Sequence, residues 1–501
     1  MKSLSYTCLG LPLRFARHTR GNVAMIFALA LLPLTVLAGG AIDFNQAMNA
    51  RTRLAQAIDA AALAIGTYPD IGRGDATTIA QDFLAANYPE WEIGQLQSLS
   101  VDLDTINDTV TVNATAKVDT AILGLVGIEF LTVDWESEVV RARQNLELVM
   151  VLDNTGSMGG SKISALRDAA NLLTEILFDA AEDPDAIHIG LVPFAATVNV
   201  GPGYERAWWL DPNGANPLHA EWSGAANANH WDLFDAMRYE TWEGCVEARA
   251  IPMDIDDTPP SNGAPSTLFI PYFAPDEPDN DWDYRNNYIN DGTSGSTNTR
   301  LQNLDKYEDG QVWDDYGPNM RCTTTPITPL TNSEATIVNA INRMGASGTT
   351  NIPQGVGWGI RVISPEEPFT QGTAWDDDEI LKAMVILTDG DNVMSGRSTT
   401  LRSDYGAYGF SRDGRLGTTS SSSWTLRNEL NDRLEAACAL AHEMDIRVYA
   451  ITFQVSSSST RALMQDCASH PSLYFDSPSN SALRDAFQMI AGDLTNLRLS
   501  R

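Results

Sequence analysis

The chain has 501 residues, of which 43% are hydrophobic and 20% charged, and its formal net charge at pH 7 is −32. This composition is ordinary for a globular protein and excludes wholesale disorder, while the length favours more than one domain. Because phosphate recognition needs a cationic surface, the strong negative charge argues against nucleic acid as a partner. The charge alone favours a solvated acidic surface over a role in gathering cations.

The N-terminal segment differs in composition from the rest. Basic side chains precede an apolar run from Val23 to Ile42, and no acidic residue occurs before Asp43. About 20 apolar residues are enough to cross a bilayer as a helix, and the basic flank favours a cytoplasmic N-terminus. We therefore expect a cytoplasmic segment at 1–21 and a transmembrane helix at 22–42, with the remaining chain outside the cytoplasm. A cleaved signal peptide is the alternative, although its apolar region would be shorter.

Four of the five cysteines lie beyond this apolar run, at Cys245, Cys322, Cys438 and Cys467. Four cysteines allow three pairings, and the sequence alone does not choose among them. We favour the pairs Cys245–Cys322 and Cys438–Cys467, because each would link residues within one local region. The cysteines form no CxxC motif and the histidines are scattered, which argues against a zinc site.

Residues 43–145 are predicted to form a small α+β region. Apolar residues at helical spacing continue the N-terminal helix to Gly66, at positions Phe44, Met48, Leu54, Ile58, Ala62 and Ile65. A second helix is expected over 76–87, and strands over 96–118 and 130–143. A long helix packed on a small antiparallel sheet is the arrangement found in pilin-like proteins.

From residue 146 onward the pattern alternates between strands and helices, which is typical of a mainly parallel sheet with helices on both faces. We expect strands at 146–152, 187–195, 383–387 and 447–453, and helices at 163–178, 333–344, after Pro353, at 426–444, near 460–467 and at 481–497. Two stretches without periodicity interrupt this pattern, at about 199–328 and 392–425. Because long structureless loops are uncommon in compact domains, we interpret the first as an inserted subdomain.

The first insertion contains seven of the twelve tryptophans and an acidic run at 276–283. Tryptophans of a small subdomain usually form its core, which we favour here over an exposed platform for sugars or peptides. The acidic run lacks the spacing of a calcium-binding loop, so we interpret it as a solvated acidic loop.

Oxygen-bearing side chains follow the first predicted strand of the α/β region, at Asp153, Thr155 and Ser157. In open α/β sheets ligands bind at the carboxyl ends of the strands. A spacing of two places the three side chains on one side of an extended loop, so that their oxygens converge. Such oxygens suit a hard cation such as Mg²⁺. Lys162 lacks the neighbours that a phosphate-binding loop requires.

The segment Asp153-x-Thr155-x-Ser157 resembles the first part of the metal-ion-dependent adhesion site of von Willebrand factor A (VWA) domains. Gly348-Thr349-Thr350 resembles the second part, and Asp389, at the end of an apolar strand, resembles the third. The resemblance implies a Rossmann-like fold over 146–501. It also implies direct coordination of Mg²⁺, with Mn²⁺ or Ca²⁺ as alternatives, by Thr155, Ser157 and Thr350. Asp153 and Asp389 would act through water, and a carboxylate from a partner protein would complete the coordination.

The N-terminus carries a second resemblance, over about 60 residues. The stretch from Arg20 to Leu29, Gly40-x-x-Asp43 and the run from Ala55 to Ala64 are similar to TadG-like and TadE-like proteins of tight-adherence (Tad/Flp) pilus assembly. Because TadG-like proteins commonly join such an anchor to a VWA domain, the two resemblances reinforce each other. They imply a single-pass protein of the bacterial inner membrane, with its C-terminal domain in the periplasm.

The sequence thus favours a non-enzymatic pilus-assembly or adhesion component that binds a partner, which we expect to be another pilus-assembly component. The alternative is a pseudopilin-like scaffold of the Tad secretion machine in which the metal is incidental. An enzyme is disfavoured, since no Ser–His–Asp or Cys–His set occurs at predicted strand ends, and His188 and His442 lack evident partners.

Overall fold

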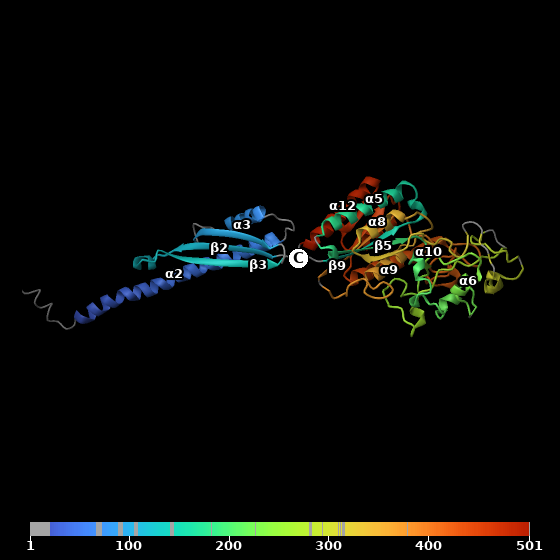
Figure 1. The fold of residues 1–501 in the computed structure, drawn as a ribbon, viewed down its shortest axis with the longest axis horizontal. Helices are drawn as coiled ribbons and strands as arrows, with labels where there is room; N and C mark the ends of the chain where they lie inside the picture. The colour runs from blue at the N-terminus through green and yellow to red at the C-terminus, as the bar shows by residue number, and fades with distance from the viewer. Residues whose placement is uncertain are drawn as a thin grey trace, which may run out of the picture. The chain divides into compact units, whose positions relative to one another are not determined.

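The computed structural model describes residues 21–66, 73–88, 94–104, 109–140, 145–181, 183–225, 227–279, 283–292, 294–308, 310, 312, 316–377 and 379–499. They form two compact units, unit 1 up to Val140 and unit 2 from Asn145 to Arg498 (Figure 1). Residues 1–20 of the predicted cytoplasmic segment, Trp282 and Trp313 lie outside the described residues.

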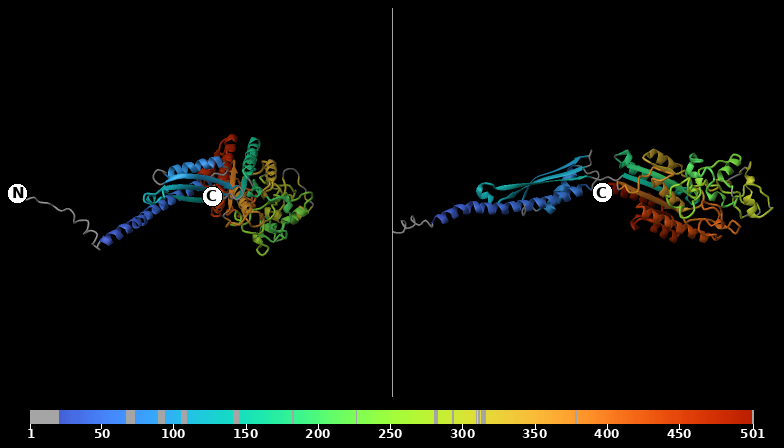
Figure 2. Two further views of the ribbon diagram at one scale, coloured as in Figure 1. Left: turned by 60° about the vertical axis from the view of Figure 1, so that its left-hand side comes forward. Right: turned by 90° about the horizontal axis from the view of Figure 1, so that it is seen from below.

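Unit 1 is a long helix packed on a three-stranded antiparallel sheet of order β1-β2-β3. Figure 2 shows the helix running along the sheet and extending beyond it towards the N-terminus. The elements are α2 (Gly21–Gly66), α3 (Arg73–Asn87), β1 (Gln95–Asp104), β2 (Thr109–Asp119) and β3 (Phe130–Val140). Helix α2 ends at the predicted Gly66. Its 46 residues include an apolar stretch that is long enough to cross a membrane.

The buried face of α2 differs from the predicted one. Leu54, Ile58, Ala62 and Ile65 lie in the core of unit 1 as expected, but Phe44 and Met48 are exposed. Small residues take the inward positions instead, at Ala47, Ala50, Ala57 and Ala61. Alanines let the helix approach the sheet closely, whereas the larger side chains of Phe44 and Met48 point outward.

Unit 2 is an α/β domain with a mainly parallel sheet. Parallel pairing joins β11 (Tyr474–Ser477), β10 (Arg447–Phe453), β9 (Ile380–Thr388), β4 (Asn145–Asp153) and β5 (Ile187–Phe194), in that order. Short antiparallel strands extend the sheet beyond β5, namely β6 (Val198–Asn199), β7 (Cys245–Val246) and β8 (Thr328–Thr331). Strand β4 lies in the middle and is buried on both faces, which explains its nearly uninterrupted apolar sequence.

Helices cover both faces of this sheet, with α5, α8 and α12 on one side and α9 and α10 on the other (Figure 1). The helices of unit 2 are α5 (Ser161–Asp179), α6 (His230–Ala236), α7 (Thr297–Gln302), α8 (Glu334–Arg343), α9 (Ile352–Ile363), α10 (Ser423–Glu443), α11 (Ser458–Cys467) and α12 (Asn480–Leu499). The strand–helix alternation follows the sequence prediction, and the short β6, β7, β8 and β11 are additions to it.

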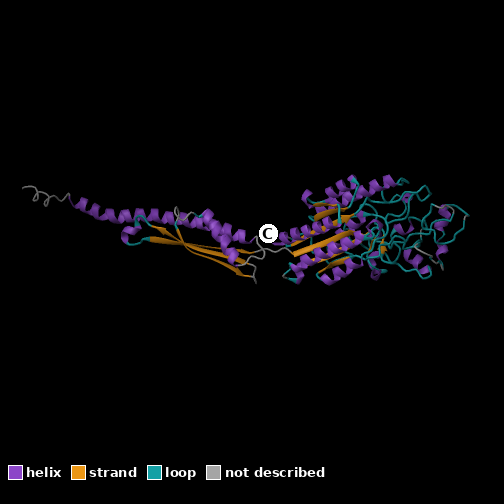
Figure 3. Ribbon diagram, turned by 90° about the horizontal axis from the view of Figure 1, so that it is seen from above, coloured by secondary structure: helices purple, strands orange, loops and turns teal. Residues whose placement is uncertain are grey.

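The two insertions gather at one end of unit 2, where Figure 3 shows mostly loops. Both favoured disulfides are present, Cys245–Cys322 within the first insertion and Cys438–Cys467 between α10 and α11. The tryptophans form a core as expected, with the exception of the partly exposed Trp208; Trp209, Trp222, Trp231 and Trp242 are buried.

The prediction of a solvated acidic loop is wrong for Asp276 and Glu277, which are both buried. Lys306 Nζ lies 2.8 Å from Asp276 Oδ2, and the backbone amide of Asn286 donates to Glu277 Oε2 over 3.0 Å. Polar partners supplied by the insertion itself let these carboxyl groups leave water, which a local sequence pattern does not reveal.

Candidate metal centre

Three segments far apart in the sequence meet at the carboxyl ends of β4 and β9. The first is the loop after β4, which carries Asp153, Thr155 and Ser157, and the third begins with Asp389 directly after β9. Because β4 and β9 are parallel neighbours paired up to Leu152 and Leu387, their ends lie side by side. Four of the five predicted ligand residues thereby come from adjacent loops of one sheet edge, and the fifth, Thr350, directly precedes Asn351 and α9 (Ile352–Ile363).

A chain of hydrogen bonds joins the first and third segments. Thr155 Oγ1 lies 2.9 Å from Ser157 Oγ, and Ser157 Oγ donates to Asp389 Oδ1 over 2.5 Å. The other carboxylate oxygen, Asp389 Oδ2, lies 2.7 Å from Lys162 Nζ. The Asp389 side chain is inaccessible to solvent, whereas that of Lys162 is 22% exposed. Two hydroxyls, a carboxylate and an ammonium group thus form one connected cluster.

Asp153 lies beneath this cluster and holds it together. Its Oδ1 accepts from the Thr155 amide over 2.8 Å, and its Oδ2 accepts from the Thr388 hydroxyl over 2.8 Å and from the Asp389 amide over 3.3 Å. Burial, and secondarily the negative charge of Asp389, raises the pKa of Asp153 to about 6. Asp153 therefore connects the end of β4 to the end of β9 and fixes the course of both loops.

The second segment, with Thr350, is held against the first by backbone hydrogen bonds. Ser347 donates to the carbonyl of Asn154 over 2.8 Å, and Gly156 donates to the carbonyl of Gly348 over 3.0 Å. Gly348 has φ +79°, which side-chain-bearing residues rarely adopt. Thr350 is buried, and within the described part of the chain its hydroxyl makes no hydrogen bond.

The chemistry of the gathered groups fits a hard divalent cation. Hydroxyl and carboxylate oxygens are the ligands that Mg²⁺ accepts, and Thr350, in the adjoining second segment, carries a further hydroxyl. Among the described residues, no group of three or more His, Cys, Asp or Glu side chains is placed to hold a metal. A cation here would therefore depend on hydroxyl ligands, with only two carboxylates nearby.

The sequence analysis did not identify two members of the cluster, and it predicted too simple a conformation for the loop after β4. Lys162 was considered only as part of a phosphate-binding loop, and Thr388 was not singled out, although it directly precedes Asp389. The signal for Lys162 is its place in the first turn of α5, five residues after Ser157. The predicted extended loop is wrong beyond Thr155, because Gly156–Met158 forms a 3-10 turn.

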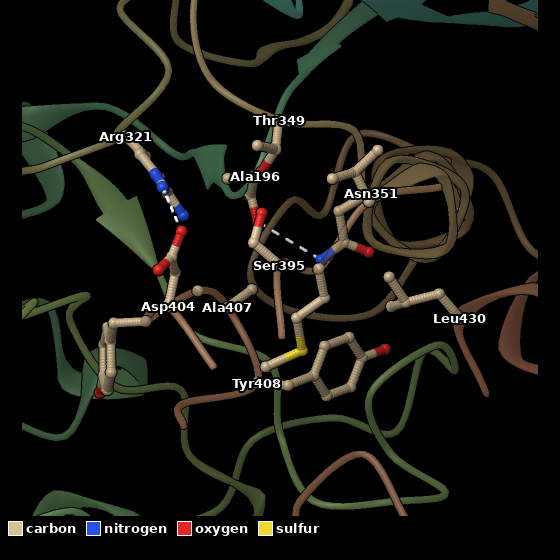
Figure 4. Close-up of a pocket in the computed structure, with 13 residues that line it drawn as sticks. Ala196, Arg321, Thr349, Asn351, Ser395, Asp404, Ala407, Tyr408 and Leu430 are labelled. Atoms are coloured by element: carbon tan, nitrogen blue, oxygen red, sulfur yellow. Dashed lines mark hydrogen bonds and ion pairs between the residues drawn. The ribbon is translucent and has the colours of Figure 1, made fainter. Parts of the chain in front are cut away.

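Both insertions border the site. The Val393 amide donates to the Thr350 carbonyl over 2.8 Å, and Asn392 Oδ1 accepts from the Ile352 amide. A small cavity of about 20 Å³ lies beside Thr349 and Asn351. Figure 4 shows that Arg321 and Asp404, which form an ion pair, also line it. A second, open cavity of about 720 Å³ is lined by Arg321 and reaches Ser347. The insertions thus leave space next to the second segment.

Several solved structures resemble this chain at low identity. The pilus adhesin SpaC from Lactobacillus rhamnosus GG matches with 13% identity and a TM-score of 0.33 over 80% of this chain, which spans only 34% of the SpaC chain. The vWF domain of the type V pili tip protein Mfa5 from Porphyromonas gingivalis matches with 9% identity and a TM-score of 0.35, covering 72% of this chain and 97% of that one. The PilB minor pilin from Streptococcus sanguinis matches with 13% identity and a TM-score of 0.33, covering 80% and 78%. TM-scores this low do not establish a shared fold.

No curated protein matches the chain. One family model does match, over residues 21–66, and it is described as "Putative Flp pilus-assembly TadE/G-like". These residues coincide with helix α2, which contains the apolar stretch, Asp43 and the alanine-rich face that packs on the sheet. The predicted resemblance is therefore confirmed for this segment: residues 21–66 are similar to the TadE/G-like family.

Proposed function

We propose that the chain is a non-enzymatic pilus-assembly or adhesion component, anchored in the bacterial inner membrane with its larger part in the periplasm. In this proposal residues 22–42 span the membrane and 43–145 form a pilin-like region. Residues 146–501 form a VWA domain that binds a partner protein through a metal-ion-dependent adhesion site. The partner is a protein that offers a carboxylate, such as another pilus-assembly component.

The continuity of α2 supports a retained anchor rather than a cleaved signal. The helix runs unbroken from the apolar stretch into the core of unit 1, where Leu54, Ile58 and Ile65 are buried. Asp43, directly after the predicted span, accepts from the backbone amides of Ala121, Ile122 and Leu123 over 2.7–3.0 Å. The residues on either side of the expected membrane boundary thus belong to one folded element.

The hydrogen-bonded series Thr155–Ser157–Asp389 is the observation that carries the metal-dependent function. Thr155, Ser157 and Thr350 would hold Mg²⁺ directly, and Asp153 and Asp389 would hold its water ligands. A bound ion would supply a Lewis-acidic position for a carboxylate of the partner, since neutral hydroxyl ligands would leave most of its charge uncompensated. Asp153 keeps the Thr155 amide and Thr388 hydroxyl in place, so that the loops need little rearrangement.

A scaffold whose metal is incidental is the second candidate, and one observation favours it. Lys162 already neutralises Asp389, and Ser157 satisfies the other oxygen of this carboxylate. The Asp389 carboxylate is therefore compensated without a divalent ion.

Metal binding by the purified full chain in detergent tests the first proposal. We expect isothermal titration with Mg²⁺ and Mn²⁺ to show one site, which Thr155→Ala and Ser157→Ala remove while the fold is kept. Ser164→Ala is the matched control, because Ser164 is exposed on α5 and bonds only its own helix, at the Gly160 carbonyl. Equal affinities in wild type and Ser157→Ala would refute the assigned ligands.

Open coordination is tested by the water relaxation rate of the Mn²⁺-loaded chain. An aspartate-containing tripeptide should lower this rate by displacing bound water, whereas the corresponding asparagine peptide should not. To separate the scaffold candidate, pili are counted on cells that carry Ser157→Ala. Normal piliation together with lost metal binding in vitro would favour the scaffold.

A further inference from the structure

An apolar turn of unit 1 projects beside the place where α2 leaves the sheet. It connects β2 to β3 and contains the 3-10 turn Leu123–Val126. Large apolar side chains on it are exposed, with Leu125 81% accessible and Val126, Ile128 and Phe130 between 44% and 49%. We call the segment from Ala121 to Phe130 the apolar turn. Exposed apolar clusters of this kind usually mark a surface that another phase or molecule covers.

The apolar turn is fixed to α2 at the end of the predicted membrane span. Asp43 is buried and accepts three backbone amides of the turn, those of Ala121, Ile122 and Leu123. One helical turn earlier, a Cβ on Gly39 would lie 2.1 Å from Ile122 Cγ2, so glycine is required for this close approach. The position of the apolar turn along the axis of α2 is therefore fixed, at the level of Gly39 to Asp43.

The helix at this height is itself apolar and exposed. Leu34, Leu37 and Ile42 are between 56% and 72% accessible, on the side of the helix that faces away from the turn. The 18 residues from Met25 to Ile42 span roughly 27 Å, which is close to the thickness of a bilayer's hydrocarbon core of about 30 Å. If α2 is a membrane anchor, the turn lies at the outer boundary of that core.

The polar groups of the turn suit a membrane interface. Lys117 Nζ lies 4.5 Å from the centre of the Phe130 ring, which pairs a basic tip with an aromatic ring as is common at the level of lipid headgroups. Glu129 is the only charged residue between Ala121 and Phe130, and in extended backbone its side chain alternates with those of Ile128 and Phe130.

We propose that the apolar turn inserts into the outer leaflet of the membrane that α2 spans, giving unit 1 a second, shallow contact with lipid. The occupant is a lipid surface because the turn lies level with the end of the apolar, exposed stretch of α2, so that a bilayer around this stretch would reach the turn. The inference rests on the proposed membrane anchor and is independent of the metal site. Two contacts instead of one would restrict the tilt of unit 1 relative to the bilayer.

Spin-label accessibility in the full chain tests this inference. Single cysteines are placed at Leu125, Ile128, Leu37 and Glu138 in a Cys8→Ser background, labelled, and reconstituted into phosphatidylethanolamine–phosphatidylglycerol vesicles. Leu37→Cys reports the anchor. Glu138→Cys is the aqueous control, because it is exposed on β3 eight residues from Phe130, roughly 26 Å away along the strand. Collision rates with oxygen and with a water-soluble nickel chelate give the depth of each label.

We expect Leu125→Cys and Ile128→Cys to resemble Leu37→Cys, with at least a threefold higher oxygen-to-nickel ratio than Glu138→Cys. Labels at 125 and 128 that match Glu138→Cys, while Leu37→Cys lies in lipid, would overturn the inference alone. A water-accessible Leu37→Cys would overturn the anchor and the inference together. Dipolar broadening at position 125 would show that a second copy covers the turn, which also overturns it.

Discussion

Unit 2 contains two clusters of charged side chains that differ in how completely they are enclosed. In the candidate metal centre, Lys162 is partly exposed and Asp389 also bonds a hydroxyl. Between the insertions, Arg415 and Glu247 are almost completely buried, with NH1 of Arg415 2.6 Å from Glu247 Oε2. Removing one partner of a buried pair leaves an uncompensated charge, whereas water can take the place of a partner that is itself partly exposed, as Lys162 is. The candidate metal centre is thus suited to exchanging one cation for another, and the cluster around Arg415 is suited to holding the two insertions together.

The supporting role of the buried cluster predicts the largest effect. Arg415 joins Glu247 of the first insertion to the second, and Tyr405 donates to the same carboxylate over 2.5 Å. We expect Arg415→Met to lower the free energy of unfolding by about 3–5 kcal/mol, because Glu247 would remain buried without its cation. Urea denaturation followed by tryptophan fluorescence measures this. Arg206→Met is the control: its pair with Asp235 is largely exposed, so a loss below about 1 kcal/mol is expected. Equal losses would contradict the distinction.

Glu277, another buried carboxyl group of the first insertion, should make the stability of the protein depend on pH. Burial raises the pKa of Glu277 from 4.5 to about 7, although two backbone amides, those of Arg285 and Asn286, oppose this rise. With a folded-state pKa above the unfolded one, the folded protein holds a proton that the unfolded chain releases. Stability should therefore fall as the pH rises from 4.5 to 7, by up to about 3 kcal/mol.

Glu277→Gln should abolish this component, since glutamine keeps the acceptor oxygen but does not ionise. The variant should match wild type near pH 4.5 and exceed it at pH 8, as measured by denaturation over this range. Glu308→Gln, at an exposed position, should leave the pH profile of wild type unchanged. A constant difference between wild type and Glu277→Gln would contradict the proton linkage.

The residues of the candidate site could be predicted from the sequence because each of its segments has a recognisable pattern of neighbouring residues. An apolar strand that is buried on both faces ends in an aspartate, and this recurs at Asp153 and Asp389. Parallel pairing then brings the two ends together. The helix that contains the predicted anchor could also be predicted up to Gly66. Its signals, a long apolar run and regularly spaced alanines, both lie within one continuous segment.

Contacts between distant segments could not be predicted in the same way. Lys162 and Asp389 are 227 residues apart, and nothing in the sequence around Lys162 indicates its partner. Asp276 and Glu277 looked solvated because their neighbours are acidic, yet Lys306 and two backbone amides enclose them. Phe44 and Met48 have helical spacing, but only the packing distance to the sheet determines that they face outward.

Of the substitutions predicted here, replacement of Lys162 should have the smallest effect, and one confined to the candidate metal centre. Its ammonium group lies 2.7 Å from Asp389 Oδ2 and therefore competes with a cation for that carboxylate. Lys162→Met keeps the aliphatic packing and removes the charge. Because water can take the place of the partly exposed ammonium group, the free energy of unfolding should fall by less than in Arg415→Met, although the inaccessible Asp389 loses its cation. Mg²⁺ affinity should rise roughly tenfold, which corresponds to about 1.4 kcal/mol. Titration calorimetry measures the affinity, with Lys117→Met in unit 1 as a control of equal charge change. Unchanged affinity would mean that the ammonium group and the metal ion do not compete, and weaker binding would make Lys162 a support of the site, comparable to Arg415 between the insertions.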